Sequence, residues 1–237
     1  MNNKFLINWL IFAVSVSLAF FFVRNVMNKS RFDKKVIDLT HVFSQNISVS
    51  SYDEPPQLEK IKTLQKDGYN NWRLTVGMHT GTHIDGPGHL TDSKLLMSDI
   101  SIDKFVGAGY LVDARGKSAV TADLLTNMPT TPGLIVLVLT GCDKKFGTKE
   151  YFTDYPVLDD GFVQELIKRK VKMVGLDCFS PDKYPFATHR LLFAHDMLII
   201  ENLTGLEQLV GVKQFDVVAL PLKLTADSSP ARVIALV

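Results

Sequence analysis

The chain has 237 residues, 46% of them hydrophobic, so it can bury one sizeable core or one core with a small appendage. Its 26 Lys and Arg nearly balance its 25 Asp and Glu, and a net charge of +1 argues against a nucleic-acid partner. Cys142 and Cys178 lie far apart, which argues against a zinc-thiolate motif or a disulfide framework and favours two buried small side chains.

The first predicted element is an apolar helix at residues 5–23, which carry no charged side chain. At about 1.5 Å per residue, such a helix roughly matches the ~30 Å hydrocarbon core of a bilayer. We therefore expect a single-pass membrane anchor over residues 1–24 and a polar linker over residues 25–35. Basic residues follow the apolar run more densely than they precede it, which places the next domain in the cytoplasm. The alternative is a signal peptide, cleaved at a weak site around residues 17–19, and an exported domain.

A strand-rich domain is predicted from residue 36 to residue 237. Short apolar or β-branched runs recur at residues 36–40, 72–80, 109–114, 134–140, 171–177, 197–203, 215–222 and 231–237. Between these runs, residues 159–170 set apolar side chains at helical spacing behind acidic residues, and residues 204–209 suggest a shorter helix. These elements indicate a single α/β domain.

The stretch HTGTHIDGPGH at residues 79–89 holds His79, His83, Asp85 and His89, although the chain has only six histidines. Burying such side chains unpaired costs free energy, so a structural role does not explain their density. Gly-Pro-Gly would break a helix that carries two His at i and i+4, as in a zinc-protease motif, and indicates a strand end that turns into a loop. Residues two apart in a strand point the same way, which aims His83 and Asp85 at one point. The glycine-rich turns fold His79 and His89 back toward it. Imidazole and carboxylate ligands suit zinc, manganese or iron in the +2 state.

A rigid metal site needs ligands from more than one stretch, and two distant candidates stand out. His189 precedes an apolar run, and Glu201 ends a predicted strand in which an unpaired carboxylate would be costly. On the residues alone, both also have an ordinary structural explanation, with Glu201 paired to a lysine and with His195 and Asp196 forming a turn.

The motif resembles the HxGTHxDxPxH signature of the metal-dependent cyclase family, which includes bacterial kynurenine formamidases and isatin hydrolases. The similarity covers nearly all of residues 36–237. It is carried by DLTH at 38, DGYNNWRLTVGMHTGTHIDGPGH at 67, TGCDKKFGTKEYF at 140, VGLDCFSPD at 174, HRLLF at 189, IIENLTGLEQL at 199 and LPLKLTADSSPARVIA at 220.

The resemblance implies a role for each candidate residue. His79 and His83 would hold one metal, Asp85 would bridge toward a second, and His189 and Glu201 would complete the site. His89 matches the family's proton donor and acceptor. The resemblance also implies a swivelling β/β/α-type fold and a homodimer or larger homo-oligomer, and it leaves His195 outside the site.

The expected activity is metal-dependent hydrolysis of a small aromatic or cyclic amide, most like that of an arylformamidase, which converts N-formylkynurenine to kynurenine in tryptophan catabolism. One or two Zn²⁺ or Mn²⁺ ions would lower the pKa of a bound water toward about 7, and His89 would carry the proton. Two alternatives stay open: a membrane-tethered metabolite- or metal-binding protein without turnover, and a cyclase or dehydratase that uses the same site. His41, in DLTH, either lines the pocket or is a hydrogen-bonded structural residue.

One segment departs from the family pattern. Kynurenine formamidases typically read PVWPGDTP after DLTH, with the tryptophan close to the aromatic substrate. Here SVSSYDEPP places Ser50 at that position, in an alignment that needs a one-residue shift, and Tyr52 is the nearest aromatic replacement. Ser50 and Tyr52 are therefore the candidate substrate-binding residues.

Overall fold

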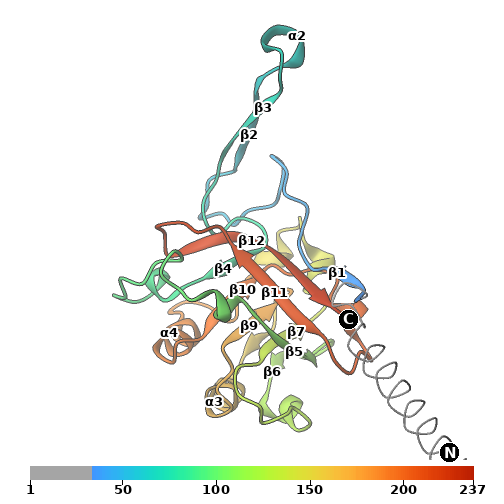
Figure 1. Cartoon of the computed structure of the whole chain (residues 1–237). Helices are drawn as coiled ribbons and strands as arrows, with labels where there is room; N and C mark the ends of the chain where they lie inside the picture. The colour runs from blue at the N-terminus through green and yellow to red at the C-terminus, as the bar shows by residue number, and fades with distance from the viewer. Residues whose placement is uncertain (1–33) are drawn as a thin grey trace, which may run out of the picture. The chain divides into compact units, whose positions relative to one another are not determined.

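A large mixed sheet organises the chain in the computed structural model, which describes residues 34–237 (Figure 1). Its strands follow the order β1-β12-β11-β5-β7-β9-β10-β4. A further pairing of β4 with β12 closes the strands from β12 to β4 into a ring, and β1 pairs with β12 outside that ring. The strands are β1 (Val36–Asp38), β4 (His83–Asp85), β5 (Val106–Asp113), β7 (Ile135–Leu139), β9 (Met173–Leu176), β10 (Leu198–Glu201), β11 (Asp216–Pro221) and β12 (Ser228–Leu236).

The alternating side chains of the central strand β7 divide the core into two parts. All five residues of β7 are buried, because both faces of the strand are covered. Ile135, Leu137 and Leu139 pack with apolar residues of β11 and β12 inside the ring. Val136 and Val138 point the other way, toward the helices. The apolar pattern of the strand thus explains why the sheet is covered on both sides.

Helices cover only part of the outer face of the sheet. α3 (Asp160–Lys168) starts where the Asp159 carboxylate accepts the Phe162 N–H at 2.7 Å, and it buries Phe162, Val163 and Leu166. α4 (Ala187–Ala194) buries His189 together with Leu192 and Phe193. Apart from one short α-helix in the arm described below, the remaining helices in the described residues are short 3₁₀ turns: η1 (Pro87–His89), η2 (Ile102–Phe105), η3 (Ala122–Leu125), η4 (Cys142–Lys145), η5 (Glu150–Phe152) and η6 (Leu206–Leu209).

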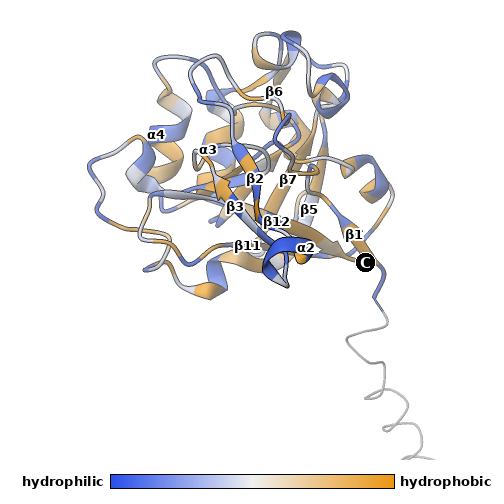
Figure 2. Cartoon of the chain, turned by 90° about the horizontal axis from the view of Figure 1, so that it is seen from above, coloured by the Kyte–Doolittle hydropathy of each residue, from blue (hydrophilic) through white to orange (hydrophobic). Residues whose placement is uncertain are grey.

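A two-stranded arm extends away from the sheet (Figure 1). It consists of β2 (Gln57–Lys62), α2 (Leu64–Asp67) and β3 (Asn71–Thr75), and all of β3 is exposed. Trp72 and Leu74 lie on one face of the arm, and their cross-strand partners in β2 are Lys60 and Leu58, respectively. Figure 2 shows that α2 is largely hydrophilic. Two further short strands, β6 (Ala119–Val120) and β8 (Val157–Leu158), pair with each other.

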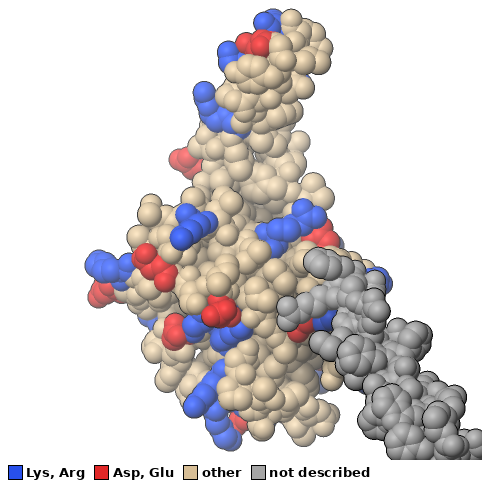
Figure 3. Space-filling model, in the orientation of Figure 1, with Lys and Arg blue, Asp and Glu red and all other residues tan. Residues whose placement is uncertain are grey.

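Charged side chains of both signs are scattered over the face shown in Figure 3. Neither the arm nor the sheet presents a continuous basic surface in that view. This distribution agrees with the balanced net charge of the sequence, which argued against a nucleic-acid partner.

Two expectations from the sequence need correction. The α/β class of the swivelling β/β/α type is wrong, because a closed ring of strands dominates the structure and the helices are few and short. The predicted anchor at residues 1–24 lies outside the described residues. Within residues 34–237, none of the helices has the length and apolar character needed to cross a bilayer. The single-pass membrane localisation, with its cytoplasmic domain, is therefore not upheld.

Candidate metal centre

Strand register brings three of the predicted ligands together. His83 and Asp85 lie on the same face of β4, and Glu201 of β10 is the direct cross-strand partner of His83. The His83 Nε2 atom lies 3.4 Å from Glu201 Oε2 and 3.3 Å from Asp85 Oδ1. Ile84 and Ile200, on the opposite face of the same strands, pack into the core inside the ring. The period of two along each strand therefore separates the ligand candidates from the core.

The turns on either side of β4 add two imidazoles. His79, in the turn before β4, places Nδ1 2.8 Å from Asp85 Oδ1. His89 ends η1, and its ring centroid lies 4.0 Å from that of His79. The structure thus brings the three histidines and the aspartate of the 79–89 stretch to one place.

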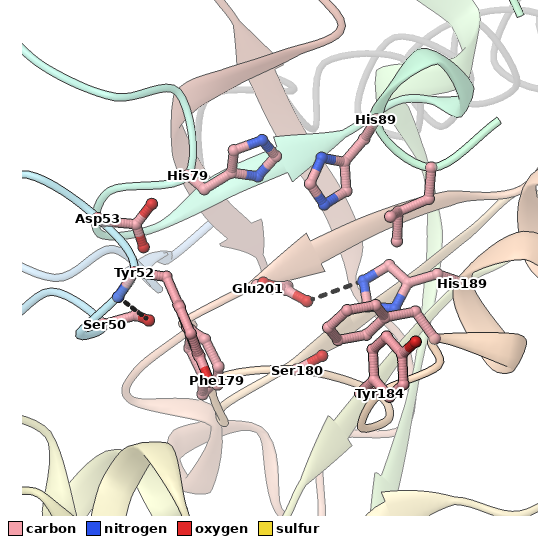
Figure 4. Close-up of a pocket in the computed structure, with 12 residues that line it drawn as sticks. Ser50, Tyr52, Asp53, His79, His89, Phe179, Ser180, Tyr184, His189 and Glu201 are labelled. Atoms are coloured by element: carbon pink, nitrogen blue, oxygen red, sulfur yellow. Dashed lines mark hydrogen bonds and ion pairs between the residues drawn. The ribbon is translucent and has the colours of Figure 1, made fainter. Parts of the chain in front are cut away.

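His189 enters from the opposite side, on α4, as Figure 4 shows. Its Nε2 atom lies 3.3 Å from Glu201 Oε1. The Asp182 carboxylate accepts both the His189 ring Nδ1–H, at 2.6 Å, and the His189 backbone N–H, at 3.1 Å. Because Nδ1 is occupied in this way, Nε2 is the ring nitrogen that faces Glu201 and the site.

A similar arrangement fixes His83. Its Nδ1 atom lies 2.8 Å from the Gly81 carbonyl oxygen, so the ring donates there and leaves Nε2 facing Asp85 and Glu201. The Asn202 side chain also donates to the Gly81 carbonyl, at 3.0 Å, and accepts the Tyr151 hydroxyl at 2.7 Å. These buried groups orient the imidazole before any ligand binds.

Several buried polar atoms at this point have no hydrogen-bond partner among the described residues. They are His83 Nε2, both Asp85 oxygens and Glu201 Oε1. Polar groups buried in this way are costly unless something satisfies them. Ligand atoms of His79, His83 and Asp85 all lie within 4.8 Å of one another, and so do those of Asp85, His189 and Glu201. The donor set therefore fits a divalent cation, with Asp85 shared between the two groups.

The charges in the cluster shift its pKa values strongly. Burial lowers the pKa of His83, but Asp85 and Glu201 outweigh it and raise the pKa well above its usual range. Burial raises the pKa of Asp85, but His83 and His79 hold it well below its usual range. For His89, burial and the neighbouring imidazoles lower the pKa. His89 is therefore neutral at neutral pH and able to accept a proton.

A cavity of about 480 Å³ opens beside these residues (Figure 4). Its lining combines polar residues with an apolar wall, and consists of Ser50, Tyr52, Asp53, His79, His89, Leu90, Phe179, Ser180, Tyr184, Phe186, His189 and Glu201. The two predicted substrate-binding residues are among them. Ser50 is buried, and its hydroxyl accepts the Tyr52 backbone N–H at 3.2 Å, whereas the Tyr52 side chain is 95% exposed at the rim.

The other two histidines lie elsewhere. His195 follows the last residue of α4 and is exposed. His41 stacks on Phe146, with ring centroids 3.8 Å apart, and does not line the cavity. Burial lowers the pKa of His41. Cys142 and Cys178 are both free and buried, as their spacing indicated.

Sequence reasoning missed three polar residues beside the site. Asp182 follows a proline and lies before the N-cap Phe186 of α4, outside the first helical turn, so it carries no capping signal that could have identified it. Asn202 follows Glu201 with a positive φ of 57° and gave no such signal. Asp227 lies in a short polar run before β12 that has the composition of an ordinary turn.

Comparison with known proteins identifies relatives of this chain. A family model described as "Putative cyclase" matches residues 37–183. A kynurenine formamidase of Bacillus cytotoxicus is 30% identical over 204 residues, which span 84% of this chain and 95% of that protein.

Two solved structures are similar in fold. A crystal structure of an isatin hydrolase bound to the product analogue thioisatinate has a TM-score of 0.78 at 22% identity, covering 94% of this chain and 98% of that chain. A potential metal-dependent hydrolase with cyclase activity has a TM-score of 0.70 at 26% identity, covering 85% and 97%.

Proposed function

Because the chain belongs to the Cyclase family, we propose that it is a metal-dependent hydrolase that cleaves the carbon–nitrogen bond of a small aromatic or cyclic amide, most like an arylformamidase. One observation carries this proposal. Buried polar atoms of His83, Asp85 and Glu201 lack hydrogen-bond partners within residues 34–237, and Glu201 lines a cavity that His89 also lines.

In this proposal, His79, His83, Asp85, His189 and Glu201 hold the cation. Nitrogen and carboxylate donors suit Zn²⁺ or Mn²⁺, and the two overlapping groups that share Asp85 accommodate one ion or two. When bound, the cation supplies a Lewis acid that polarises a carbonyl oxygen and lowers the pKa of a water molecule.

The protein's own groups then move the proton. His89 lines the cavity, and we assign it no place among the ligands, so its ring is available to the reactants. It takes a proton from the water that attacks the carbonyl carbon, and it gives that proton to the nitrogen as the carbon–nitrogen bond breaks. Such a proton transfer contributes about 10²–10⁴-fold to the rate.

The cavity wall supports an aromatic or cyclic substrate. Leu90, Phe179 and Phe186 give the cavity apolar surface beside the polar residues of the metal centre. Ser50 and Tyr52 form another part of the lining, where we place the ring of the substrate. Aromatic contacts of this kind are worth about 0.5–1.5 kcal/mol beyond their buried area.

We further propose that the protein is a homodimer or a larger homo-oligomer. The exposed face of the arm, with Trp72 and Leu74, supports this, because large apolar side chains gathered on one surface are typical of protein contacts. Light scattering after size-exclusion chromatography measures the assembly directly.

Removal and return of the metal test the proposed activity. We expect protein treated with a chelator to hydrolyse neither N-formylkynurenine nor isatin, and protein reloaded with Zn²⁺ or Mn²⁺ to hydrolyse at least one of them. The Asp85→Asn variant should not recover. Product analysis distinguishes hydrolysis from cyclisation or dehydration. Stoichiometric metal binding without turnover of any amide would contradict the proposal and leave a binding protein.

A further inference from the structure

The loop before β12 is fixed against the loop that carries His89. The Gly86 N–H donates to the Asp227 carbonyl at 3.0 Å, and the Met97 N–H donates to the Ala226 carbonyl at 2.8 Å. Immediately after Asp227, β12 begins and pairs with β4, and its first residue, Ser228, lies opposite Asp85. The position of Asp227 is therefore set by backbone bonds on both sides.

Two glycines of the 79–89 stretch make this close approach possible. A Cβ atom at Gly86 would lie 2.6 Å from the Asp227 carbonyl oxygen, and one at Gly88 would lie 3.1 Å from the Asp227 Cβ. Any larger residue at Gly86 would push the Asp227 backbone away. The two glycines thus have a steric role that is separate from metal binding, because their lack of a side chain leaves room for Asp227.

The Asp227 carboxylate faces the ring of His89. Asp227 Oδ2 lies 3.7 Å from His89 Nδ1, and within residues 34–237 it is the only carboxylate within 4.0 Å of a ring nitrogen of His89. This distance is longer than a hydrogen bond, but bonds between catalytic groups are often long before substrate binds. Both side chains are partly exposed, so a small rotation of either one closes the gap.

We infer that Asp227 is a positioning residue for His89, an inference that rests on the proposed function. Its carboxylate accepts the Nδ1–H of the neutral ring, which leaves the lone pair of Nε2 for the reactants. His89 Nε2 takes the proton of the attacking water as the new carbon–oxygen bond forms. The same proton passes to the nitrogen as the carbon–nitrogen bond breaks. Throughout, the other ring proton stays on Nδ1 and is donated to the Asp227 carboxylate.

A second arrangement competes with this one. A further group of possible ligand atoms lies within 4.8 Å of one another and comes from His79, His89 and Asp227, so these three residues could hold a cation. In that case Asp227 would be a ligand, and its replacement would remove metal. Metal content therefore separates the two roles.

The tautomer of His89 tests the inference without any need for turnover. In the Zn²⁺-loaded full chain, we expect ¹⁵N NMR of the His89 ring, assigned with the His89→Asn variant, to show the Nδ1–H tautomer as the main form. Asp227→Asn should shift the ring toward a mixture of tautomers. Asp92→Asn, which removes an exposed carboxylate three residues from His89, should leave the tautomer unchanged. An unchanged tautomer in Asp227→Asn would overturn the inference.

Kinetics give the second readout. We expect Asp227→Asn to keep its full metal content and to lower kcat about tenfold to a hundredfold, with KM within about twofold of the wild type. In an His89→Asn background, the Asp227 change should have no further effect, because both act through one ring. Metal loss, or additive effects of the two changes, would refute the positioning role. If the wild type hydrolyses no amide, the proposed function fails, but the tautomer measurement still decides the role of Asp227.

Discussion

Glu201 and His83 face each other across the antiparallel pairing of β10 and β4, with 3.4 Å between Oε2 and Nε2. Both side chains are buried, and both leave the strands on the face opposite to the core residues Ile84 and Ile200. The backbone register therefore holds this pair in place. A change of side chain at either position should alter the site without moving the sheet.

The first prediction concerns Glu201→Gln. A neutral amide oxygen is a poorer ligand than a carboxylate, so we expect metal affinity to fall at least tenfold. The metal-free protein should be less stable to heat, because the variant loses the contacts of the buried carboxylate with His83 and His189, which hold the Glu201 pKa below its usual range although burial raises it. Metal competition assays and thermal unfolding in chelator measure the two effects. Glu207→Gln, at an exposed position on η6, is the matched control. Unchanged metal affinity would remove Glu201 from the ligand set.

The second prediction separates the ligands from the proton carrier. We expect His89→Asn to retain most of its metal and to lose turnover by at least about a hundredfold, whereas Asp85→Asn should lose both metal and turnover. The two residues lie in the same short stretch, so each serves as a control for the other. Metal analysis and initial rates are measured on the same preparations. Equal metal loss in the two variants would make His89 a ligand.

The third prediction concerns stability and pH. Asp177 is buried and accepts hydrogen bonds from Thr140 N (2.8 Å), Thr140 Oγ1 (2.6 Å) and Gly141 N (2.7 Å). Burial raises the pKa of Asp177 from 3.8 to about 6, although these bonds lower it. The folded state thus binds the proton more tightly than the unfolded state. The resulting stability is fully present below pH 3.8 and is lost as the pH rises through about 6.

We therefore expect the unfolding free energy of the wild type, minus that of Asp177→Asn, to fall by about 2–3 kcal/mol across this window. Urea unfolding at a series of pH values measures the difference, and subtraction cancels the pH dependence that both proteins share. A flat difference curve for Asp177→Asn would show that its carboxyl group titrates normally.

The fourth prediction concerns the substrate. Ser50 lines the cavity, and the resemblance, with a one-residue shift, aligns it with a tryptophan of the kynurenine formamidase pattern. We expect the wild type to hydrolyse N-formylkynurenine with low kcat/KM, and Ser50→Trp to raise it roughly three- to tenfold by restoring an aromatic contact. Ser50→Ala, which removes the hydroxyl that accepts the Tyr52 N–H, is the control for loss of the serine itself. If Ser50→Trp has no effect while Tyr52→Ala abolishes binding, the substrate ring lies against Tyr52 instead.

The local pattern of the sequence was enough to locate most of the strands, but not to arrange them. Each of the eight predicted runs overlaps a strand of the structure. For all of them except the run at β3, which is exposed, the reason is that alternating or continuous apolar residues report burial. Residues 159–170 contain α3, which has an acidic N-cap and an apolar stripe. The ring closure was not visible, because it depends on β12 pairing with β4, and pairing between distant strands leaves no local trace. That closure is why the α/β prediction failed.

The missed elements had weak local signals for physical reasons. α4 starts after Phe186, which has a positive φ of 61° and makes no capping hydrogen bond, so the usual start signal is absent. The strand β2 reads QLEKIK, and its charges suit an exposed arm better than a core strand. In the site, the alternation along β4 predicted that His83 and Asp85 share a face. The contacts of Asp182 and Asp227 came only from the tertiary structure, since carboxylates in turns are common.

The strand β4 has only three residues, yet it lies between β10 and β12 and completes the ring. Two of those residues, His83 and Asp85, are also ligand candidates, so a cation held with Glu201 would cross-link segments that are far apart along the chain. Such a cross-link adds its binding free energy to the folded state and restricts local opening of the seam where the ring closes. Chelation should therefore speed amide hydrogen exchange at β4 and its partners on β10 and β12 before it affects the centre of β7. Removal of the cation would then abolish the activity and loosen the closure of the ring at the same time.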